Sequence, residues 1–293
     1  MNVLISGSPG FLGSCLVKRI SSHGHKVIAL TRAGSNNYRL LDSTGECEFY
    51  CVENKNFNKI FMKYDIDIVI NTVVDYGRGE LKLESVIESN LIYGLMLLEA
   101  SIKAGVAAYI NTDTLLIREI DAYSLSKAQL VDWMRFIPKK NTKVINVKIE
   151  HFFGILDDDT KFIYWLMSQL KKNVNVVNLT SGVQKRDFIY IDDVVDAYIC
   201  IINNIEVLPS YEEFELGSGN SVSIKYIINK IYTKISQRRK VDTKLNFGAV
   251  PYRKNEQMDM SANISKIQRL GWKVNISLDI GMDKVINHIF KDN

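Results

Sequence analysis

Short, continuous apolar runs separated by longer amphipathic stretches fill the first half of the chain. A strand that is buried on both faces carries no polar alternation, so such runs are typical of a parallel sheet covered by helices. We therefore predict an α/β fold with a doubly wound parallel sheet. The predicted strands are 2–6, 26–30, 67–71, 107–111 and 143–149. The predicted helices include 11–23, 83–104 and 123–136.

The pattern changes after about residue 155, where short strands alternate with helices and no linker rich in Pro, Gly or Ser intervenes. This favours a smaller lobe interleaved with the sheet over an independent domain. We predict that residues 1–155 form the core domain. Residues 156–293 would form mostly the second lobe, with some segments returning to the sheet. The expected segments are strands 174–178 and 186–191 and helices 192–202, 223–235 and 278–290.

Composition and charge exclude several classes of protein. The chain has 37 basic and 33 acidic residues, a formal charge of +4, and no basic stripe beyond residues 237–240, so we expect no nucleic-acid binding. Cys47 and Cys51 have a loose metal-type spacing, but no second ligand pair follows, so we expect no metal site. The N-terminus begins directly with a predicted strand, and we expect that no apolar run is long enough to cross a bilayer. These features predict a cytoplasmic protein.

Three glycines in a Gly-x-x-Gly-x-x-Gly spacing connect the first strand to the first helix. The first glycine permits a tight turn, the second lets the backbone approach a diphosphate, and the third lets helix and strand pack closely. The helix N-terminus then offers free N–H groups to phosphate. The pattern predicts a Rossmann dinucleotide site. Its expected contact residues are Gly7, Ser8, Gly10, Phe11, Leu12 and Gly13.

The end of the second strand indicates which dinucleotide is bound. An acidic residue there would bind the ribose hydroxyls and favour NAD, but the chain has Thr31, Arg32 and Ser35. A guanidinium with nearby hydroxyls suits a 2′-phosphate. We therefore predict NADP (as NADPH), with NAD as the alternative.

Tyr123 and Lys127 lie four residues apart on one predicted helix and so share a face. A neighbouring ammonium favours the phenolate, so we expect the pKa of Tyr123 to lie below its usual value near 10, where proton transfer is efficient. The strand before this helix ends in Thr112-Asp113-Thr114. A hydroxyl there can donate to a substrate oxygen.

Along nearly its whole length the chain resembles the extended short-chain dehydrogenase/reductases, a family of sugar-nucleotide epimerases, dehydratases and reductases. The matching features are GxxGFLG, the hydroxyl-bearing strand end before YxxxK, an Asn-containing helix, and the segments 184–193, 214–219 and 252–256. The resemblance implies that Thr112, Tyr123 and Lys127 are catalytic. It also implies that Asn90, Tyr123 and Lys127 contact the cofactor.

Departures from the family pattern narrow the expected activity. The 4,6-dehydratases carry an Asp-Glu pair after the catalytic Thr, whereas this chain has Asp113-Thr114, which argues against dehydration. The chain looks most like 4-ketoreductases that finish deoxysugars for surface polysaccharide such as lipopolysaccharide O-antigen, for example the CDP-abequose and CDP-paratose synthases. The resemblance implies that Arg186 and Arg253 contact the nucleotide diphosphate of the substrate. The other expected substrate contacts are Asp75, Tyr76, Arg78, Asp113, Thr114, His151 and Tyr190.

The expected function is thus NADPH-dependent reduction of a nucleotide-activated 4-keto-deoxysugar at C4. Two alternatives stay open: a 4-epimerase with tightly held NAD, and a non-catalytic dinucleotide sensor. The nucleotide base and the stereochemistry of reduction are left open. The resemblance also implies a homodimer that pairs through helices 83–104 and 123–136.

Overall fold

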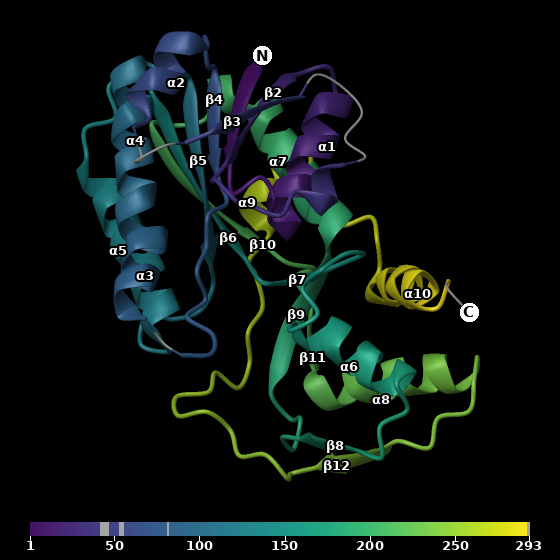
Figure 1. Ribbon diagram of the computed structural model, residues 1–293. Helices are drawn as coiled ribbons and strands as arrows, with labels where there is room; N and C mark the ends of the chain where they lie inside the picture. Colours follow the sequence, from purple (N-terminus) through teal and green to yellow (C-terminus); the bar gives the residue numbers. More distant parts are fainter. Residues whose placement is uncertain (42–46, 53–55, 81, 292–293) are drawn as a thin grey trace. The chain divides into compact units, whose positions relative to one another are not determined.

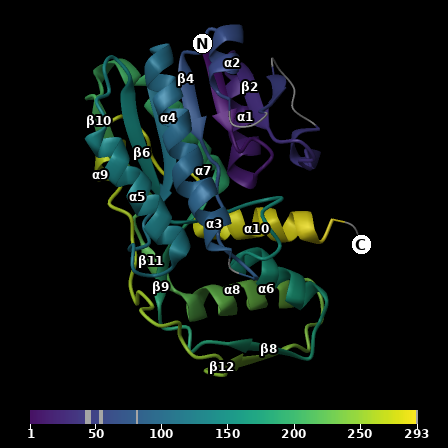
Figure 2. The same ribbon diagram turned by 60° about the vertical axis from the view of Figure 1, so that its left-hand side comes forward.

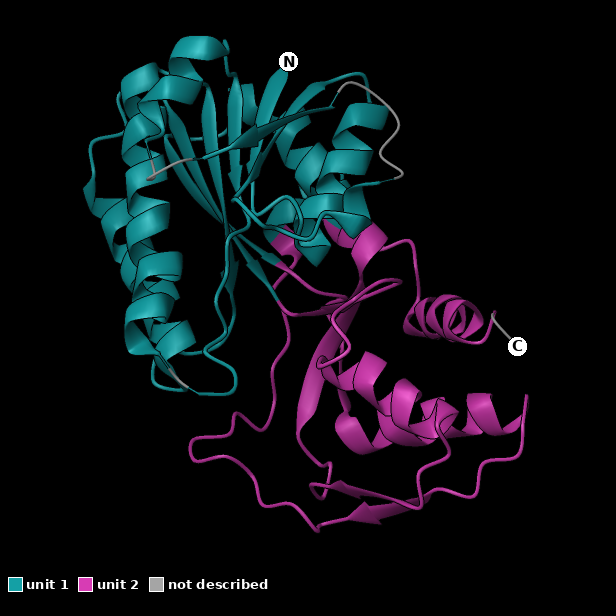
Figure 3. Ribbon diagram, viewed as in Figure 1, with its two compact units in different colours: residues 1–149, 195–215, 266–272 teal, residues 150–194, 216–265, 273–293 magenta. Residues whose placement is uncertain are grey.

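A computed structural model describes residues 1–41, 47–52, 56–80 and 82–291. The chain divides into two compact units, shown in Figure 3. The first comprises residues 1–149, 195–215 and 266–272, and the second comprises residues 150–194, 216–265 and 273–293. The first boundary thus follows Ile149, where the sequence suggested a division after residue 155. Two later segments belong with the sheet-containing unit.

The first unit is built on a doubly wound sheet, as predicted (Figure 1). In the described residues its strand order is β10-β6-β5-β4-β1-β2-β3, and each pairing from β3 to β6 is parallel. The order reverses beside β1, which places the carboxyl ends of β1 and β4 at a topological switch point. The strands are β1 (Asn2–Ser6), β2 (Lys26–Thr31), β3 (Cys47–Cys51), β4 (Ile68–Asn71), β5 (Ala108–Thr114), β6 (Lys143–Ile149) and β10 (Tyr211–Leu216).

Helices cover both faces of this sheet. Helices α4 and α5 pack together on one face, and α1 and α7 lie on the other, where Arg19 of α1 pairs with Asp196 of α7 at 2.5 Å (Figures 1 and 2). The helices are α1 (Phe11–Ser22), α2 (Asn58–Lys63), α3 (Leu83–Ile87), the π-helical turn η2 (Glu88–Ile92), α4 (Tyr93–Ala104), α5 (Ala122–Phe136), most of α7 (Ile191–Asn203) and part of α9 (Ser265–Gln268). Two 3₁₀ turns are η1 (Tyr38–Leu40) and η3 (Ile205–Val207).

The core of the first unit lies between the sheet and the α4–α5 layer. Leu97 of α4 and Leu130 and Met134 of α5 are wholly buried against Val69 and Tyr109 of the central strands. Full burial of each such side chain contributes about 1.5–3 kcal/mol. This packing fixes α5, and with it the Tyr-Lys pair, over the end of β5.

The continuous helical stretch Leu83–Ala104 is 22 residues long and apolar enough to cross a membrane. This corrects the expectation that no apolar run reaches that length. The buried side chains of α4 pack into the sheet core, as they do in a core helix of this composition.

The second unit contains a three-stranded sheet of order β11-β9-β7 and a two-stranded sheet of β12 and β8. Its carboxylate Asp187 is wholly buried and accepts hydrogen bonds from the backbone N–H groups of Ser218, Gly219 and Ala262. The elements are β7 (His151–Phe153), α6 (Phe162–Lys171), β8 (Val176–Leu179), β9 (Lys185–Tyr190), β11 (Ser221–Ser223), α8 (Ile224–Ser236), β12 (Lys244–Phe247) and α10 (Leu278–Ile289).

Candidate active site

The glycine loop between β1 and α1 is held in place by close contacts. Gly7 has a φ of +73°, and a Cβ there would lie 2.6 Å from Thr72 Oγ1. A Cβ at Gly13 would lie 2.3 Å from the carbonyl oxygen of Gly7. Ser8 Oγ donates a 2.7 Å hydrogen bond to the carbonyl of Leu30 in β2. The first and third glycines are therefore required by the turn and by the packing of α1, and Ser8 ties the loop to the next strand.

The remaining part of this loop fits a dinucleotide diphosphate. A Cβ at Gly10 would meet only the Gly7 carbonyl oxygen, at 3.1 Å, so the outer side of Gly10 is open to a close-lying ligand. Gly10 is also the N-cap of α1, whose first turn carries no acidic side chain. Unpaired N–H groups and the helix dipole favour an anion at such an end. Phe11 and Leu12 are buried and anchor the helix rather than line an open surface.

Arg32 follows β2 in an exposed position. Its backbone N–H donates to Ser35 Oγ at 3.3 Å, which closes the short turn after Thr31. Within the described ranges, the Arg32 guanidinium makes no hydrogen bond or ion pair. The side chain is therefore available for an anionic group at the end of β2.

Tyr123 and Lys127 lie in the first turns of α5 because Asp121 caps that helix. Asp121 Oδ1 accepts a 2.8 Å hydrogen bond from the N–H of Ser124, and the Ser124 hydroxyl completes a capping box. Lys127 is 2 % exposed, and its Nζ donates to the carbonyls of Val73 and Thr112 at 3.2 and 3.0 Å. An ammonium has three donors, so one is left for a ligand hydroxyl. Burial lowers the pKa of Lys127 to about 8.

The pKa of Tyr123 is raised well above 10, contrary to the prediction that Lys127 lowers it. Burial is the main cause, and the neighbouring Tyr76 and the Asp113 carboxylate add to it. The Tyr123 phenol therefore holds its proton at neutral pH.

The two threonines at the end of β5 have different partners. Thr112 Oγ1 lies 2.6 Å from the hydroxyl of Tyr198, a wholly buried residue of α7. Thr114 Oγ1 accepts a 3.2 Å hydrogen bond from the N–H of Leu116. The catalytic role of Thr112 stays a prediction. In this structure its hydroxyl hydrogen-bonds the Tyr198 side chain.

The loop after β4 is fastened by Asn90 in the π-helical turn. The Asn90 side chain accepts from the N–H of Asp75 at 2.9 Å, and donates to the carbonyl of Asp75 at 2.8 Å and to Ser126 Oγ at 3.1 Å. The Asp75 carboxylate accepts from Gly77 N–H and the Ser85 hydroxyl. Asn90, predicted to touch cofactor, and Asp75, predicted to touch substrate, thus both hold this loop together.

This fastened loop brings Tyr76 to the candidate acid. The Tyr76 and Tyr123 ring centroids are 5.0 Å apart, with the rings tilted by 48°. The guanidinium of Arg78 lies 4.8 Å from the Tyr76 ring centroid. One predicted substrate contact, Tyr76, therefore lies beside the Tyr123 ring, and another, Arg78, lies over the ring of Tyr76.

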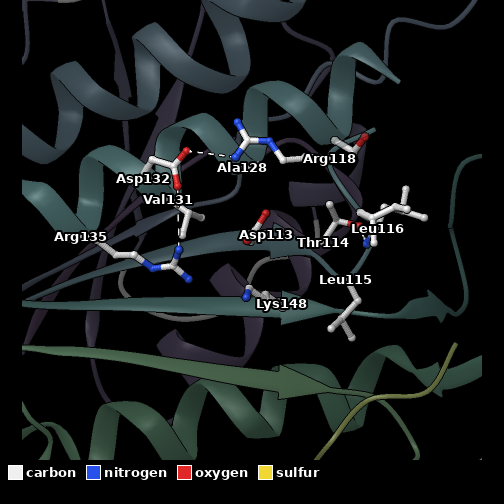
Figure 4. Close-up of a pocket in the computed structure, with 12 residues that line it drawn as sticks. Asp113, Thr114, Leu115, Leu116, Arg118, Ala128, Val131, Asp132, Arg135 and Lys148 are labelled. Carbon is white, nitrogen blue, oxygen red and sulfur yellow. Dashed lines mark hydrogen bonds and ion pairs between the residues drawn. The ribbon is translucent and has the colours of Figure 1, made fainter. Parts of the chain in front are cut away.

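A pocket of about 220 Å³ lies between α5 and the ends of β5 and β6 (Figure 4). Asp113 and Thr114 line it, and Tyr123 and Lys127 do not. Asp113 is 7 % exposed, accepts from Asn146 Nδ2 at 2.8 Å, and has a pKa raised by burial. The pocket's cations are already paired: Arg118 with Asp132, and Arg135 and Lys148 with Glu213.

The second unit holds the other predicted substrate contacts. Arg186 and Arg253 both pair with one carboxylate, Glu256, and Arg186 is 4 % exposed. His151 Nδ1 lies 2.6 Å from Glu150 Oε2. Tyr190 is buried, with its ring 5.6 Å from that of Phe153. These residues are thus gathered within their own unit, around Glu256 and in β7–β9.

Sequence reasoning missed Tyr198 and Glu256 as partners of candidate site residues. Tyr198 lies 86 positions from Thr112, and no local pattern links the two. Glu256 was visible as part of an Arg-x-x-Glu motif, which could have indicated an i,i+3 ion pair.

The chain resembles characterised enzymes of sugar-nucleotide metabolism over nearly its full length. It is 28% identical to a CDP-abequose synthase from Salmonella typhimurium, over 98% of both chains. It is 25% identical to a dTDP-4-dehydro-6-deoxyglucose reductase from Escherichia coli, over 98% of this chain and 97% of the relative.

A solved structure shows the same fold. The UDP-glucose 4-epimerase of Thermotoga maritima aligns with a TM-score of 0.85 and 21% identity, over 99% of both chains. The model of the NAD dependent epimerase/dehydratase family matches residues 3–217. The chain therefore belongs to the NAD dependent epimerase/dehydratase family, as an NAD(P)-dependent oxidoreductase of the extended short-chain dehydrogenase/reductase type.

Proposed function

We propose that this enzyme reduces the C4 ketone of a nucleotide-activated 4-keto-deoxysugar, with NADPH as the reductant. The observation that carries the proposal is that Tyr123 lies one turn of α5 from the buried Lys127, whose Nζ donates to the Thr112 carbonyl at the end of β5. Relatives named as CDP-abequose synthase and dTDP-4-dehydro-6-deoxyglucose reductase support this class of reaction.

A bound NADPH would supply the hydride to C4. Tyr123 donates its phenolic proton to the alkoxide oxygen that forms at C4, and Lys127 holds the backbone carbonyls of Val73 and Thr112 in register with α5. An acid is useful only while it is protonated, and burial keeps the Tyr123 proton in place at neutral pH. Arg32, which suits NADPH rather than a tightly held NAD, favours ketone reduction over epimerisation.

Dehydration needs a further acid–base group to eliminate water. The residue after Asp113 is Thr114, whose hydroxyl is a poor general base, and Asp113 itself is buried and bonded to Asn146. The side chains at the end of β5 therefore support reduction without elimination.

NADPH use, rather than NADH use, is proposed from the exposed Arg32 at the end of β2. A guanidinium pairs with a phosphate through two parallel hydrogen bonds, and a 2′-phosphate is the group that distinguishes the two cofactors. Side-by-side titration with NADPH and NADH tests this, and tighter NADH binding contradicts it. We also propose that the enzyme acts in the cytoplasm, where sugar nucleotides would be its substrates.

Replacing Tyr123 by Phe tests the proposal. We expect turnover to fall about 10²–10⁴-fold while NADPH still binds, because one positioned acid is lost. The matched control is Tyr226→Phe on α8, where the side chain is 47% exposed. Full turnover by Tyr123→Phe would contradict the assignment.

A further inference from the structure

The loop after β4 carries Tyr76 on a fastened backbone. The residue before it, Asp75, is held at both of its backbone polar atoms by the Asn90 side chain, which accepts at 2.9 Å and donates at 2.8 Å. Asn90 is 1% exposed, so water does not compete for these bonds. The residue after it, Gly77, donates its N–H to the Asp75 carboxylate at 2.8 Å. Tyr76 therefore projects from a segment that is held on both sides.

The Tyr76 side chain packs against the ring of the candidate acid. The ring centroids of Tyr76 and Tyr123 are 5.0 Å apart, and the rings are tilted by 48°. Aromatic pairs prefer centroid separations of about 4.5–7 Å, so this is a close pair. The Arg78 guanidinium lies 4.8 Å from the Tyr76 centroid, within the range of a cation–π contact. The Tyr76 ring is thus held by its own neighbour while it contacts Tyr123.

The position of the Tyr123 phenol depends on more than its helix. The Asp121 cap fixes the start of α5 and, with it, the Cα and Cβ atoms of Tyr123. The ring can still take different staggered rotamers about the Cα–Cβ bond. A neighbouring ring that is itself fastened favours the rotamer that packs against it. The contact with Tyr76 therefore supplies a constraint that the helix does not.

We propose that Tyr76 is a positioning residue, which holds the Tyr123 ring in the orientation from which its phenol donates a proton to the C4 oxygen. Tyr76 acts through its aromatic ring, gains and loses no proton, and so differs from the substrate contact expected from the sequence. The inference deepens the proposed function and rests on it for its catalytic meaning. Its physical basis is that a displacement of about 1 Å in a reacting group can cost about 10²-fold in rate.

Steady-state kinetics separates the ring of Tyr76 from its hydroxyl. Tyr76→Leu removes the ring, and we expect kcat to fall about 10–100-fold while KM and the Kd of NADPH stay within about threefold of wild type. Tyr76→Phe keeps the ring and should restore kcat to within about threefold of wild type. The matched control is Tyr226→Leu on α8, which removes a tyrosine ring at a 47% exposed position and should leave kcat unchanged.

Crystal structures test the positioning step in the absence of substrate. We expect the Tyr123 ring to keep its wild-type conformer in Tyr76→Phe. In Tyr76→Leu we expect the ring to be displaced or to occupy more than one conformer. If Tyr76→Leu does not fold, Tyr76→Met, which keeps a long apolar side chain without the ring, replaces it in both experiments.

The inference is overturned if Tyr76→Leu keeps the kcat of wild type, or if Tyr76→Phe loses as much kcat as Tyr76→Leu. It is also overturned if kcat falls while the Tyr123 ring stays in its wild-type conformer. Failure of the proposed function looks different. In that case the wild type oxidises no NADPH with any 4-keto sugar nucleotide, while the crystal structures still show whether Tyr76 sets the position of the Tyr123 ring.

Discussion

Tyr123 and Lys127 titrate away from their ordinary ranges in opposite directions, and burial is the main cause of both shifts. The pKa of Lys127 falls to about 8 and that of Tyr123 rises well above 10, because a buried site disfavours either charge. The spacing of the two residues was readable from the sequence. The burial that decides their protonation depends on how α5 packs, and the sequence pattern does not show it.

The lowered pKa of Lys127 predicts a pH dependence of stability. Between about pH 8 and the ordinary lysine value of 10.5, the unfolded chain holds a proton that the folded chain has released. The free energy of unfolding contributed by this group therefore rises with pH across that window. We expect the unfolding free energy of wild type minus that of Lys127→Met, measured by urea denaturation, to increase from pH 8 to pH 10.

The buried tyrosines affect the free energy of unfolding above pH 10. They are present in both proteins, so their effect cancels when the unfolding free energy of Lys127→Met is subtracted from that of wild type. Lys240→Met is the matched control, since its side chain is 85% exposed, and its curve should run parallel to that of wild type. A constant difference between wild type and Lys127→Met over this window would contradict the shifted pKa.

Among the elements, the buried strands were predicted well and the edge strands were not. β1 and β6 have the predicted bounds because each contains adjacent apolar residues, Val3–Ile5 in β1 and Val144-Ile145 in β6. β3 was missed because its pattern at the sheet edge is mostly exposed, and β10 because it carries three glutamate or tyrosine side chains before its first buried residue. The helix predicted at 83–104 is interrupted by the π-helical turn that places Asn90, a detail that periodicity alone does not resolve.

The packing of α1 against its own loop predicts the effect of Gly13→Ala. A Cβ there would lie 2.3 Å from the Gly7 carbonyl, so helix or loop must shift. We expect a loss of about 1–3 kcal/mol in the free energy of unfolding, the usual cost of overpacking. Fluorescence titration should show NADPH binding at least about 10-fold weaker, because the same shift displaces the N–H groups that we propose bind the phosphates.

Ser22→Ala, near the C-terminal end of the same helix, is the control and should leave both quantities near wild type. If Gly13→Ala binds NADPH as tightly as wild type does, the glycine loop is not the dinucleotide site.

On the scale of the whole molecule, the sequence predicted an interleaved second lobe but not its boundaries. Residues 195–215 and 266–272 return to the first unit, where α7 supplies Tyr198 and β10 supplies Glu213. Those returns depend on tertiary contacts between distant segments. The glycine loop and the Tyr-Lys pair could be recognised because each is a local spacing, whereas the Thr112–Tyr198 and Lys148–Glu213 contacts could not.

We propose that the protein is a homodimer that pairs through α3, α4 and α5. Large apolar side chains on these helices are exposed, among them Trp133 at 45% and Phe136 at 77%, with ring centroids 5.9 Å apart. We expect analytical ultracentrifugation to give the wild-type protein a mass of twice the 33.4 kDa of one chain. The double variant Trp133→Glu/Phe136→Glu should sediment as a monomer. Met62→Glu, at an 87% exposed position on α2, is the control.

The most direct test of the proposed reduction counts reducing equivalents. Purified enzyme is mixed with NADPH and a 4-keto-6-deoxy sugar nucleotide, in separate CDP- and dTDP-linked reactions, and the loss of NADPH absorbance is compared with product formed by NMR. We expect one NADPH oxidised for each C4 hydroxyl created, in at least one reaction. Interconversion of C4-hydroxyl sugar nucleotides with no net NADPH oxidation, or NADPH left unchanged in both reactions, would contradict the proposal.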